Sequence, residues 1–226
     1  MPVRRAVGGC HQRQIRSMSD VARHYGWTSD KTPPSVRVIM PALTRMLRQR
    51  GSRRLVDLGC GNGALTGLLA AEGFDVCGLD ADAQAIALAR KAHPALRFEQ
   101  LALGAKAAAT VREIVPGADT VIAIEVIEHL FRPADLIVCA GGILPVGGTL
   151  ILSTPYHGYL KNLAITLMNG WDKHWNPARE GGHIKFWSRP TLTRFLDANG
   201  FDIEECVGVG RAPWLWHSMV VAARKR

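Results

Sequence analysis

Residues 54–63 read Arg-Leu-Val-Asp-Leu-Gly-Cys-Gly-Asn-Gly, an apolar run that passes directly into a turn with three alternating glycines. The apolar run is typical of a buried parallel strand. Gly59, Gly61 and Gly63 allow the backbone to bend sharply and to approach a ligand closely. A helix beginning near Ala64 would direct its free N–H groups at the same ligand. The stretch therefore predicts a nucleoside-binding crevice at the first strand-to-helix crossover.

An acidic residue follows at the end of the next expected strand. Asp75 to Leu79 reads as that strand, and Asp80 follows Gly63 by seventeen residues. A carboxylate at this place can accept hydrogen bonds from both hydroxyls of a ribose. The structural alternative is that Asp80 caps the helix beginning near Ala83, but Asp82 is better placed for that role. We therefore assign Asp80 to ribose binding.

The glycine motif alone leaves the identity of the nucleoside cofactor open. The run from Gly59 to Ala64 also fits the dinucleotide pattern with alanine in the last place, so a nicotinamide cofactor has to be weighed. Asp57 argues against it, because a carboxylate at the mouth of the turn would repel a pyrophosphate. The same carboxylate would suit the ammonium group of an amino-acid moiety.

The stretch from Asp57 to Gly63 matches Asp-x-Gly-x-Gly-x-Gly, and in this the chain resembles the class I S-adenosylmethionine-dependent methyltransferases. Thr120 to Glu125 looks like the fourth strand of that family, and Glu125-Val-Ile-Glu-His-Leu130 looks like the segment after it. Pro145 to Pro155 is similar to the family's glycine turn and fifth strand. The ubiquinone-biosynthesis O-methyltransferases are the group it resembles most. The resemblance covers residues 50–155 and implies a Rossmann-like, doubly wound α/β fold with a mostly parallel seven-stranded sheet and helices on both faces.

The resemblance also implies where the cofactor binds. S-adenosylmethionine would be the methyl donor, with S-adenosylhomocysteine as its product. Its amino-acid end would lie at the glycine turn, its ribose at Asp80, and its adenine at the backbone of Leu101 and Ala102. The residues expected to bind it are Asp57, Gly59, Cys60, Gly61, Gly63, Asp80, Ala81, Leu101, Ala102, Ile124 and Glu125.

Methyl transfer from a sulfonium is an in-line displacement on a strong electrophile, so the protein mainly supplies alignment and a dry site. A base assists when the nucleophile is a hydroxyl. His129 is the first candidate, because it follows the fourth strand and histidine titrates near neutral pH. His183 is the second candidate, and Glu128 is grouped with both. The alternative for His129 is a structural hydrogen bond that holds the turn.

A metal site is the alternative use of the same residues. Glu125, Glu128 and His129, with His183 some fifty residues later, look like the metal-binding set of the small-RNA 3′-terminal 2′-O-methyltransferases. Two carboxylates and two imidazoles would suit a divalent ion that polarises vicinal hydroxyls. Glu-x-x-Glu-His also occurs in relatives without a metal. We therefore expect no metal ligands here, with a divalent metal as the alternative that chelation would test.

The least regular part of the chain, residues 156–187, lies between the fifth strand and the last helix and should roof the substrate site. Five of the six tryptophans lie between Trp171 and Trp216. Such a cluster suits an aromatic or apolar, lipid-like substrate, although we expect Trp214 and Trp216 to belong to the core. Ahead of the first helix, Tyr25 and Trp27 indicate a segment that either folds over the cofactor or plugs the edge of the sheet.

Length and composition agree with a single methyltransferase domain over residues 18–226. The 226 residues are 47% hydrophobic and 21% charged, and no stretch is apolar and long enough to span a membrane. Residues 1–17 are basic and acid-free, superficially like a transit peptide, and we expect a disordered extension ahead of a start at Met18. The five cysteines are scattered and odd in number, which favours reduced thiols in the cytoplasm.

The net charge of +9 raises the alternative of an RNA substrate. The basic residues gather at the two ends of the chain and between Arg45 and Arg54, so we expect solvated surfaces rather than a nucleic-acid patch. Three functional hypotheses follow: methylation of a small-molecule hydroxyl, methylation of RNA, and a nicotinamide-dependent oxidoreductase or nucleotide sensor. The sequence does not indicate the oligomeric state.

Overall fold

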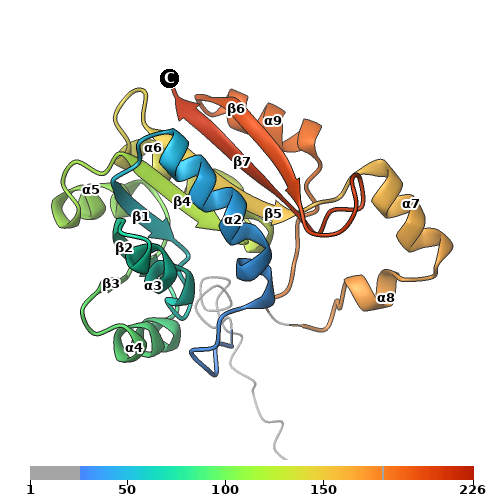
Figure 1. Cartoon of the computed structure of the whole chain (residues 1–226), viewed down its shortest axis with the longest axis horizontal. Helices are drawn as coiled ribbons and strands as arrows, with labels where there is room; N and C mark the ends of the chain where they lie inside the picture. Colours follow the sequence, from blue (N-terminus) through green and yellow to red (C-terminus); the bar gives the residue numbers. More distant parts are fainter. Residues whose placement is uncertain (1–25, 180) are drawn as a thin grey trace, which may run out of the picture.

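The computed structural model, which describes residues 26–179 and 181–226, contains a seven-stranded sheet in the order β3-β2-β1-β4-β5-β7-β6 (Figure 1). Strands β1 to β5 are parallel, whereas β7 lies antiparallel between β5 and β6. The predicted Rossmann-like, mostly parallel α/β sheet is confirmed. The strands are β1 (Arg54–Leu58), β2 (Asp75–Asp80), β3 (Arg97–Gln100), β4 (Thr120–Ile124), β5 (Thr149–Pro155), β6 (Phe201–Val209) and β7 (Ser218–Lys225).

The register of the central strands brings their carboxyl ends to one edge of the sheet. Asp57 on β1 pairs with Gly78 on β2 and with Ile122 on β4. The strand order reverses at β1, because β2 and β3 lie on one side of it and β4 and β5 on the other. Ligands of open α/β sheets bind at such a reversal. The glycine turn after β1 therefore lies where a cofactor is expected.

Helices cover both faces of the sheet (Figure 1). On one face α2 and α3 pack on strand residues that include Leu55 and Ile122. On the other face α5, α6 and α9 pack on residues that include Val56 and Val121, as the alternation along a strand requires. The helices are α2 (Pro34–Gln49), α3 (Ala64–Ala71), α4 (Ala83–Ala92), α5 (Ala105–Ile114), η1 (Ile127–His129), α6 (Pro133–Ile143), α7 (Tyr159–Leu167), α8 (Trp171–His174) and α9 (Arg189–Ala198).

Two residues whose side chains are of the capping type, Asp82 and Ser188, cap helices. The Asp82 carboxylate accepts hydrogen bonds from the backbone N–H groups of Gln84 and Ala85 at 2.8 and 3.3 Å, and so caps α4. Ser188 forms a capping box at the start of α9. Because Asp82 fills the cap, the Asp80 carboxylate is left for other partners.

The structure differs from the sequence prediction in the insert and near the last strand. Residues 156–187 contain two helices, α7 and α8, where irregular chain was expected, and α5 was not predicted. The sequence from Trp214 to Ala223 predicts a strand, but β7 begins only at Ser218, because positive φ angles at Gly210, Arg211 and Trp214 turn the chain before it. The prediction that Trp214 lies in the core is wrong, since it is 58% exposed. Trp216 does pack on the core, against Tyr156.

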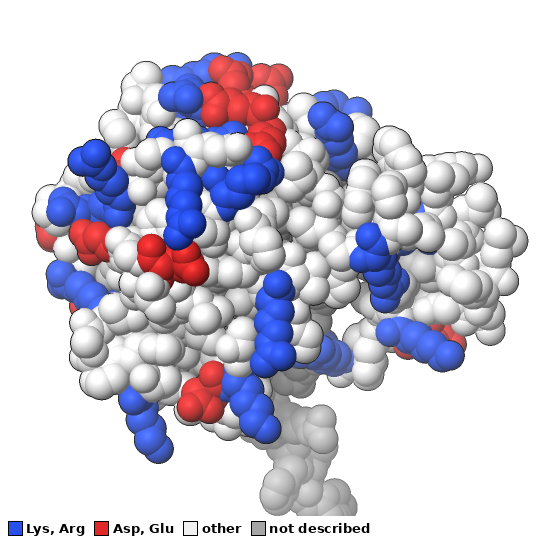
Figure 2. Space-filling view, viewed as in Figure 1, with Lys and Arg blue, Asp and Glu red and all other residues white. Residues whose placement is uncertain are grey.

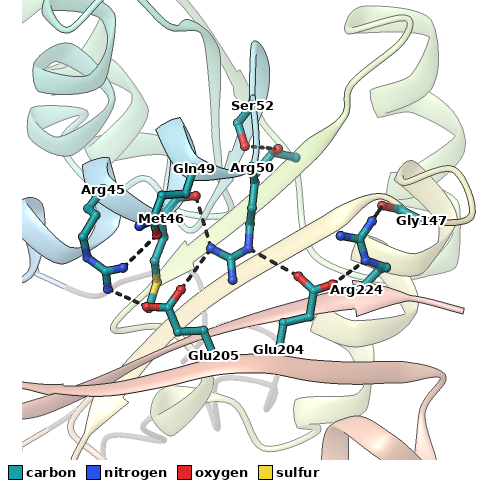
Figure 3. Close-up of polar contacts among 10 residues, drawn as sticks. Arg45, Met46, Gln49, Arg50, Ser52, Gly147, Glu204, Glu205 and Arg224 are labelled. Atoms are coloured by element: carbon teal, nitrogen blue, oxygen red, sulfur yellow. Dashed lines mark hydrogen bonds and ion pairs between the residues drawn. The ribbon is translucent and has the colours of Figure 1, made fainter.

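Several of the arginines before β1 are paired with acids on an exposed surface. Arg50 at the end of α2 contacts both acids of β6, with its guanidinium 3.1 Å from Glu205 and 3.5 Å from Glu204 (Figure 3). Arg45 also pairs with Glu205, and Arg224 on β7 pairs with Glu204. On this face of the molecule, acidic side chains lie beside the basic ones (Figure 2). These pairs join α2 to the antiparallel edge of the sheet.

Three predictions concern residues that the structure does not describe. The basic extension of residues 1–17, the proposed start at Met18, and Tyr25 lie outside the described residues. Among the residues that are described, none of the helices has the length and apolar character needed to cross a membrane.

Candidate functional site

The turn after β1 has a backbone that only glycine tolerates. Gly59, Gly61 and Gly63 have φ angles of 79°, 54° and 77°, all in the left-handed region. A Cβ on Gly59 would lie 2.6 Å from the Val126 side chain, and one on Gly61 would lie 2.4 Å from the Trp27 ring. The turn is thus packed closely by two other segments, and it leads directly into α3.

Asp80 is joined to this turn. Its carboxylate accepts hydrogen bonds from the N–H groups of Gly61 at 2.9 Å and of Asp82 at 2.8 Å. Burial raises the pKa of Asp80 from its usual value. The two features that the sequence assigned to the cofactor, the glycine turn and the acid after β2, therefore lie within hydrogen-bonding distance of each other.

Asp57 lies beneath the turn at the end of β1. It is 1% exposed, and its carboxylate accepts a hydrogen bond from the Thr66 hydroxyl at 2.7 Å. Burial raises its pKa to about 7, and the nearby charge of Asp80 acts in the same direction. A cation bound next to this carboxylate would stabilise its charged form.

The remaining residues assigned to the cofactor lie along the same edge. The backbone N–H of Leu101 donates to the Asp80 carbonyl at 2.8 Å, and the exposed Ala102 follows it in the loop after β3. The Gln100 amide donates to the Ala81 carbonyl at 3.2 Å. The chain also places buried Cys60 in the glycine turn and Ile124 at the end of β4, next to Glu125.

The segment before α2 covers the glycine turn, and Asn62 holds it there. The Asn62 amide donates to the backbone carbonyls of Ser29 at 2.9 Å and Lys31 at 3.0 Å. Its carbonyl oxygen accepts from the N–H of Ala64 at 3.2 Å, and the side chain is 2% exposed. Trp27 lies over Gly61 as described above. Sequence reasoning missed Asn62, because nothing in its local pattern indicates partners some thirty residues earlier.

Glu125 follows β4 with a strained backbone. Its φ of 57° is unusual for a residue with a side chain. Its N–H donates to the Ser153 hydroxyl at 3.0 Å, and that hydroxyl donates to the Glu125 carboxylate at 2.8 Å. Burial raises the pKa of Glu125, while hydrogen bonds and the charge of Lys161 oppose the shift. The carboxylate is thereby fixed at the carboxyl edge between β4 and β5.

The three residues predicted to be catalytic lie together. Glu128, His129 and His183 each offer an atom that could ligate a metal ion, and these atoms lie within 4.8 Å of one another. The Glu128 carbonyl accepts from the N–H groups of Ile184 at 2.9 Å and Lys185 at 3.0 Å, which fastens the insert to η1. Glu125 is not a member of this group of three.

The ionisation of the cluster suits proton transfer. The Gly182 carbonyl lies 3.1 Å from Nδ1 of His129, and because a carbonyl only accepts, Nδ1 carries the proton in this contact. Burial lowers the pKa of His129, and burial with the neighbouring His129 lowers that of His183 to about 4. Both imidazoles are therefore neutral near pH 7.

Glu128 is buried, and the nearby Thr154 hydroxyl, which favours its charged form, lies outside hydrogen-bonding geometry. It is 1% exposed, and among the described residues neither carboxylate oxygen has a hydrogen-bond partner. Burial and the charge of Glu125 raise its pKa well above the usual value. Its Oε1 lies 3.8 Å from Nε2 of His129. An orphaned carboxylate facing two imidazoles fits the donor set of a divalent cation.

A family model described as a methyltransferase domain matches residues 34–206, which include the glycine turn, Asp80 and the cluster after β4. The chain belongs to this methyltransferase family. It is 31% identical to a ubiquinone biosynthesis O-methyltransferase of Caulobacter sp., over 76% of this chain and 71% of that protein.

A second relative and a solved structure are also similar to this chain. The chain is 30% identical to a probable S-adenosylmethionine-dependent methyltransferase of Mycolicibacterium smegmatis over 73% of its own length, and it spans 58% of that protein's length. Magnesium protoporphyrin IX methyltransferase of Synechocystis, solved with bound S-adenosylhomocysteine, superimposes with a TM-score of 0.59 at 20% identity, over 92% of this chain and 93% of that one. The protein is an S-adenosylmethionine-dependent methyltransferase, and the nicotinamide hypothesis falls away.

In this methyltransferase the insert carries an aromatic cluster close to the candidate catalytic residues. The Phe186 ring lies 4.6 Å from that of His157, 6.2 Å from Trp175 and 6.5 Å from Trp171. Phe186 is 46% exposed and Trp175 is 43% exposed. Trp171 and Trp175 thus belong to a half-open aromatic surface rather than to the core of the sheet.

Proposed function

We propose that the cofactor lies along the carboxyl edge of β1, β2 and β4. The glycine turn and Asp57 would receive its amino-acid end, and Asp80 would accept the ribose hydroxyls. To do so Asp80 would exchange the hydrogen bond from Gly61 for bonds from the ribose. The backbone of Leu101 and Ala102 would contact the adenine. The arrangement in support is the hydrogen bond between Asp80 and Gly61, which joins the two halves of the site.

We infer that the acceptor is the hydroxyl of a small aromatic or apolar molecule. The observation that carries this is the pair of neutral imidazoles, His129 and His183, beside the half-open aromatic surface of the insert. A neutral imidazole can accept the proton of an attacking hydroxyl, whereas an imidazolium cannot. The ubiquinone biosynthesis O-methyltransferases among the relatives support the same chemistry.

The proposed reaction moves one methyl group and one proton. The acceptor oxygen attacks the methyl carbon in line with the carbon–sulfur bond, which breaks with its electron pair moving to sulfur. The sulfonium becomes the neutral thioether of S-adenosylhomocysteine, and the hydroxyl proton passes to the imidazole of His129 or of His183. The segment over the glycine turn and the insert would keep water from the site.

The test is release of S-adenosylhomocysteine with matched acceptors. Phenols and catechols should give turnover, whereas the corresponding methyl ethers, which lack a free hydroxyl, should not. Amines and carboxylic acids without a hydroxyl complete the panel. Turnover of an amine or a carboxylate in preference to every hydroxyl compound would contradict O-methylation while leaving the cofactor site unaffected.

A second mechanism is favoured by the orphaned Glu128 carboxylate. Glu128, His129 and His183 would hold a divalent cation, which when bound would polarise the acceptor oxygen and lower the pKa of its hydroxyl. Elemental analysis of the purified protein and activity after exhaustive chelation separate the two mechanisms. Full activity in protein free of bound metal would leave the imidazole base as the working mechanism.

We propose that nucleic acid is not the substrate and that the protein acts in the cytoplasm. The arginines between β6 and α2 are paired with acids, which leaves less free positive charge for phosphates than the composition indicates. Cys60, Cys77, Cys139 and Cys206 are free thiols. Salt-sensitive binding of RNA, measured against salt concentration, would contradict the first proposal.

A further inference from the structure

Lys161 is a buried cation that the proposed reaction does not use. It lies on α7, is 7% exposed, and donates a hydrogen bond from Nζ to the His217 carbonyl at 3.2 Å. This contact ties α7 to the loop between β6 and β7, and the two lie side by side in Figure 1. The other face of α7 is open to solvent, with Leu167 78% exposed. Lys161 therefore points inward, toward the carboxyl edge of the sheet.

The ammonium group has more donors than partners. A lysine ammonium has three N–H donors, and the His217 carbonyl receives the only hydrogen bond found for Nζ within the described part of the chain. Burial and the charge of Arg211 lower the pKa of Lys161 to about 8, so it remains mainly protonated near pH 7. A buried charge with spare donors is costly unless a ligand supplies acceptors.

The groups around Lys161 are mostly basic. Arg211, His157, His174 and His217 all interact with it electrostatically, and burial keeps the three imidazoles mainly neutral. Near pH 7 the positive charge is therefore carried by Lys161 and Arg211.

Among the described residues, an acid at the end of β4 acts on this group. Glu125 is the carboxylate whose charge acts on Lys161. That carboxylate already accepts a hydrogen bond from Ser153, and burial raises its pKa. Lys161 of the insert and Arg211 of the loop between β6 and β7 thus form an inner wall with an excess of positive charge next to the end of β4.

We propose that Lys161 binds a carboxylate on the methyl acceptor, with Arg211 as a second cation. The inference rests on the proposed small-molecule methyl transfer and narrows its substrates to acids that also carry the reacting hydroxyl. Two spare N–H donors match the two oxygens of a carboxylate. Glu125 places Lys161 beside the cofactor edge, while His183 interacts electrostatically with His157 and His217 of the same wall. A carboxylate held by Lys161 would leave the rest of the acceptor to reach His129 and His183.

Isothermal titration of the complex with S-adenosylhomocysteine tests the site without turnover. The probes are benzoate and benzamide, which share size and shape and differ in charge. Benzoate should bind about tenfold or more tightly than benzamide. Lys161→Met should abolish this preference. Lys173→Met, which removes an exposed lysine of the same insert, should retain it.

Equal binding of benzoate and benzamide by the unaltered protein would overturn the proposal, as would a preference that survives Lys161→Met. That first comparison needs no variant. Should Lys161→Met fail to fold, Lys161→Arg, which keeps the charge, should keep the preference, and Arg211→Met at an exposed position should reduce it several-fold.

Turnover separates this inference from the proposed function. With 4-hydroxybenzoate and 4-hydroxybenzamide as acceptors, kcat/KM should favour the acid in the unaltered protein, and Lys161→Met should lower kcat/KM for the acid alone. Equal losses for both acceptors would mean that Lys161 only positions Glu125, which would contradict the proposal. Benzoate binding that depends on Lys161, without methylation of any hydroxyl, would support the anion site while refuting O-methylation.

Discussion

Asp57 is expected to release a proton when the methyltransferase binds S-adenosylhomocysteine. Burial raises its pKa to about 7 in the structure, from a usual value of 3.8. The proposed amino-acid end of the ligand brings an ammonium next to this carboxylate. An opposite charge at contact distance lowers a carboxyl pKa by about 1–3 units. Binding should therefore shift Asp57 from partly protonated to ionised.

The size of the effect follows from these values. With a pKa of about 7, Asp57 holds about nine tenths of a proton at pH 6 and about half at pH 7. If the ligand lowers that pKa by about two units, most of this proton is released, and the affinity rises about fivefold from pH 6 to pH 7. The affinities are compared below pH 7.5, where the ammonium group of the ligand stays charged.

Titration calorimetry in buffers of different ionisation enthalpy measures the proton directly. Asp57→Asn is the matched variant, because an amide has the same size and its oxygen can still accept from the Thr66 hydroxyl. The variant should release about 0.8 fewer protons per ligand at pH 6. Equal proton release by both proteins at pH 6 would refute the assignment of Asp57 to the ammonium.

The same pKa predicts the stability of the ligand-free protein. A folded pKa above the unfolded one contributes stability that is complete below pH 3.8 and is lost as the pH rises through about 7. The difference of about three units corresponds to about 4 kcal/mol as an upper bound. Relative to Asp57→Asn, the unaltered protein should therefore lose stability to urea between pH 4 and pH 7. A constant difference over that range would contradict the raised pKa.

Three further substitutions test the rest of the site. Asp80→Asn should weaken S-adenosylhomocysteine binding by about 2 kcal/mol in calorimetry, because one amide oxygen cannot replace two charged acceptors, and unchanged affinity would place the ribose elsewhere. Asn62→Asp keeps the acceptor for Ala64 and loses both donors to the covering segment, so ligand dissociation in stopped-flow should accelerate about tenfold with little change in melting temperature. His183→Ala should lower kcat by about 10²-fold or more at unchanged cofactor affinity, and a loss confined to KM would argue against a role in proton transfer.

The sequence predicted the fold and the cofactor edge because both depend on local patterns. Alternating glycines after an apolar run specify left-handed backbone angles at Gly59, Gly61 and Gly63, and such angles can be inferred from residue type alone. The spacing to Asp80 then fixes the position of the next strand. The same holds for Asp82, whose residue type and place predict the cap of α4.

Contacts between distant segments could not be predicted in this way. The bonds from Asn62 to Ser29 and Lys31, and those from Ile184 and Lys185 to the Glu128 carbonyl, all involve backbone groups, which every residue type supplies. No pattern in one sequence distinguishes them. Residue types predicted that the glycine turn binds the cofactor and that the insert covers the substrate site. Only the structure shows which backbone groups hold these two segments in place.

Trp214 shows a second limit, since apolar character alone predicted burial. The chain reverses at Gly210 and Arg211 before β7, which carries Trp214 out of the core to 58% exposure, whereas Trp216 two residues later returns to it. A strand pattern read from side chains extends through such a turn, because positive φ angles at residues other than glycine leave no signature in composition.

Glu125 and Glu128 illustrate how a motif can divide its residues between two tasks. In the sequence they are equivalent members of Glu-x-x-Glu-His, which suggested four ligands for one ion. The positive φ of Glu125 and the 3₁₀ turn after it give the two carboxylates different partners, so that Glu125 is fixed by Ser153 and Glu128 faces His129. The charge of Lys161 therefore acts on Glu125, whereas Glu128 faces the neutral imidazoles. An acceptor spanning the two would meet a cation at one end and a neutral base or a metal site at the other, so a carboxylate-bearing phenol fits the proposed site at both ends.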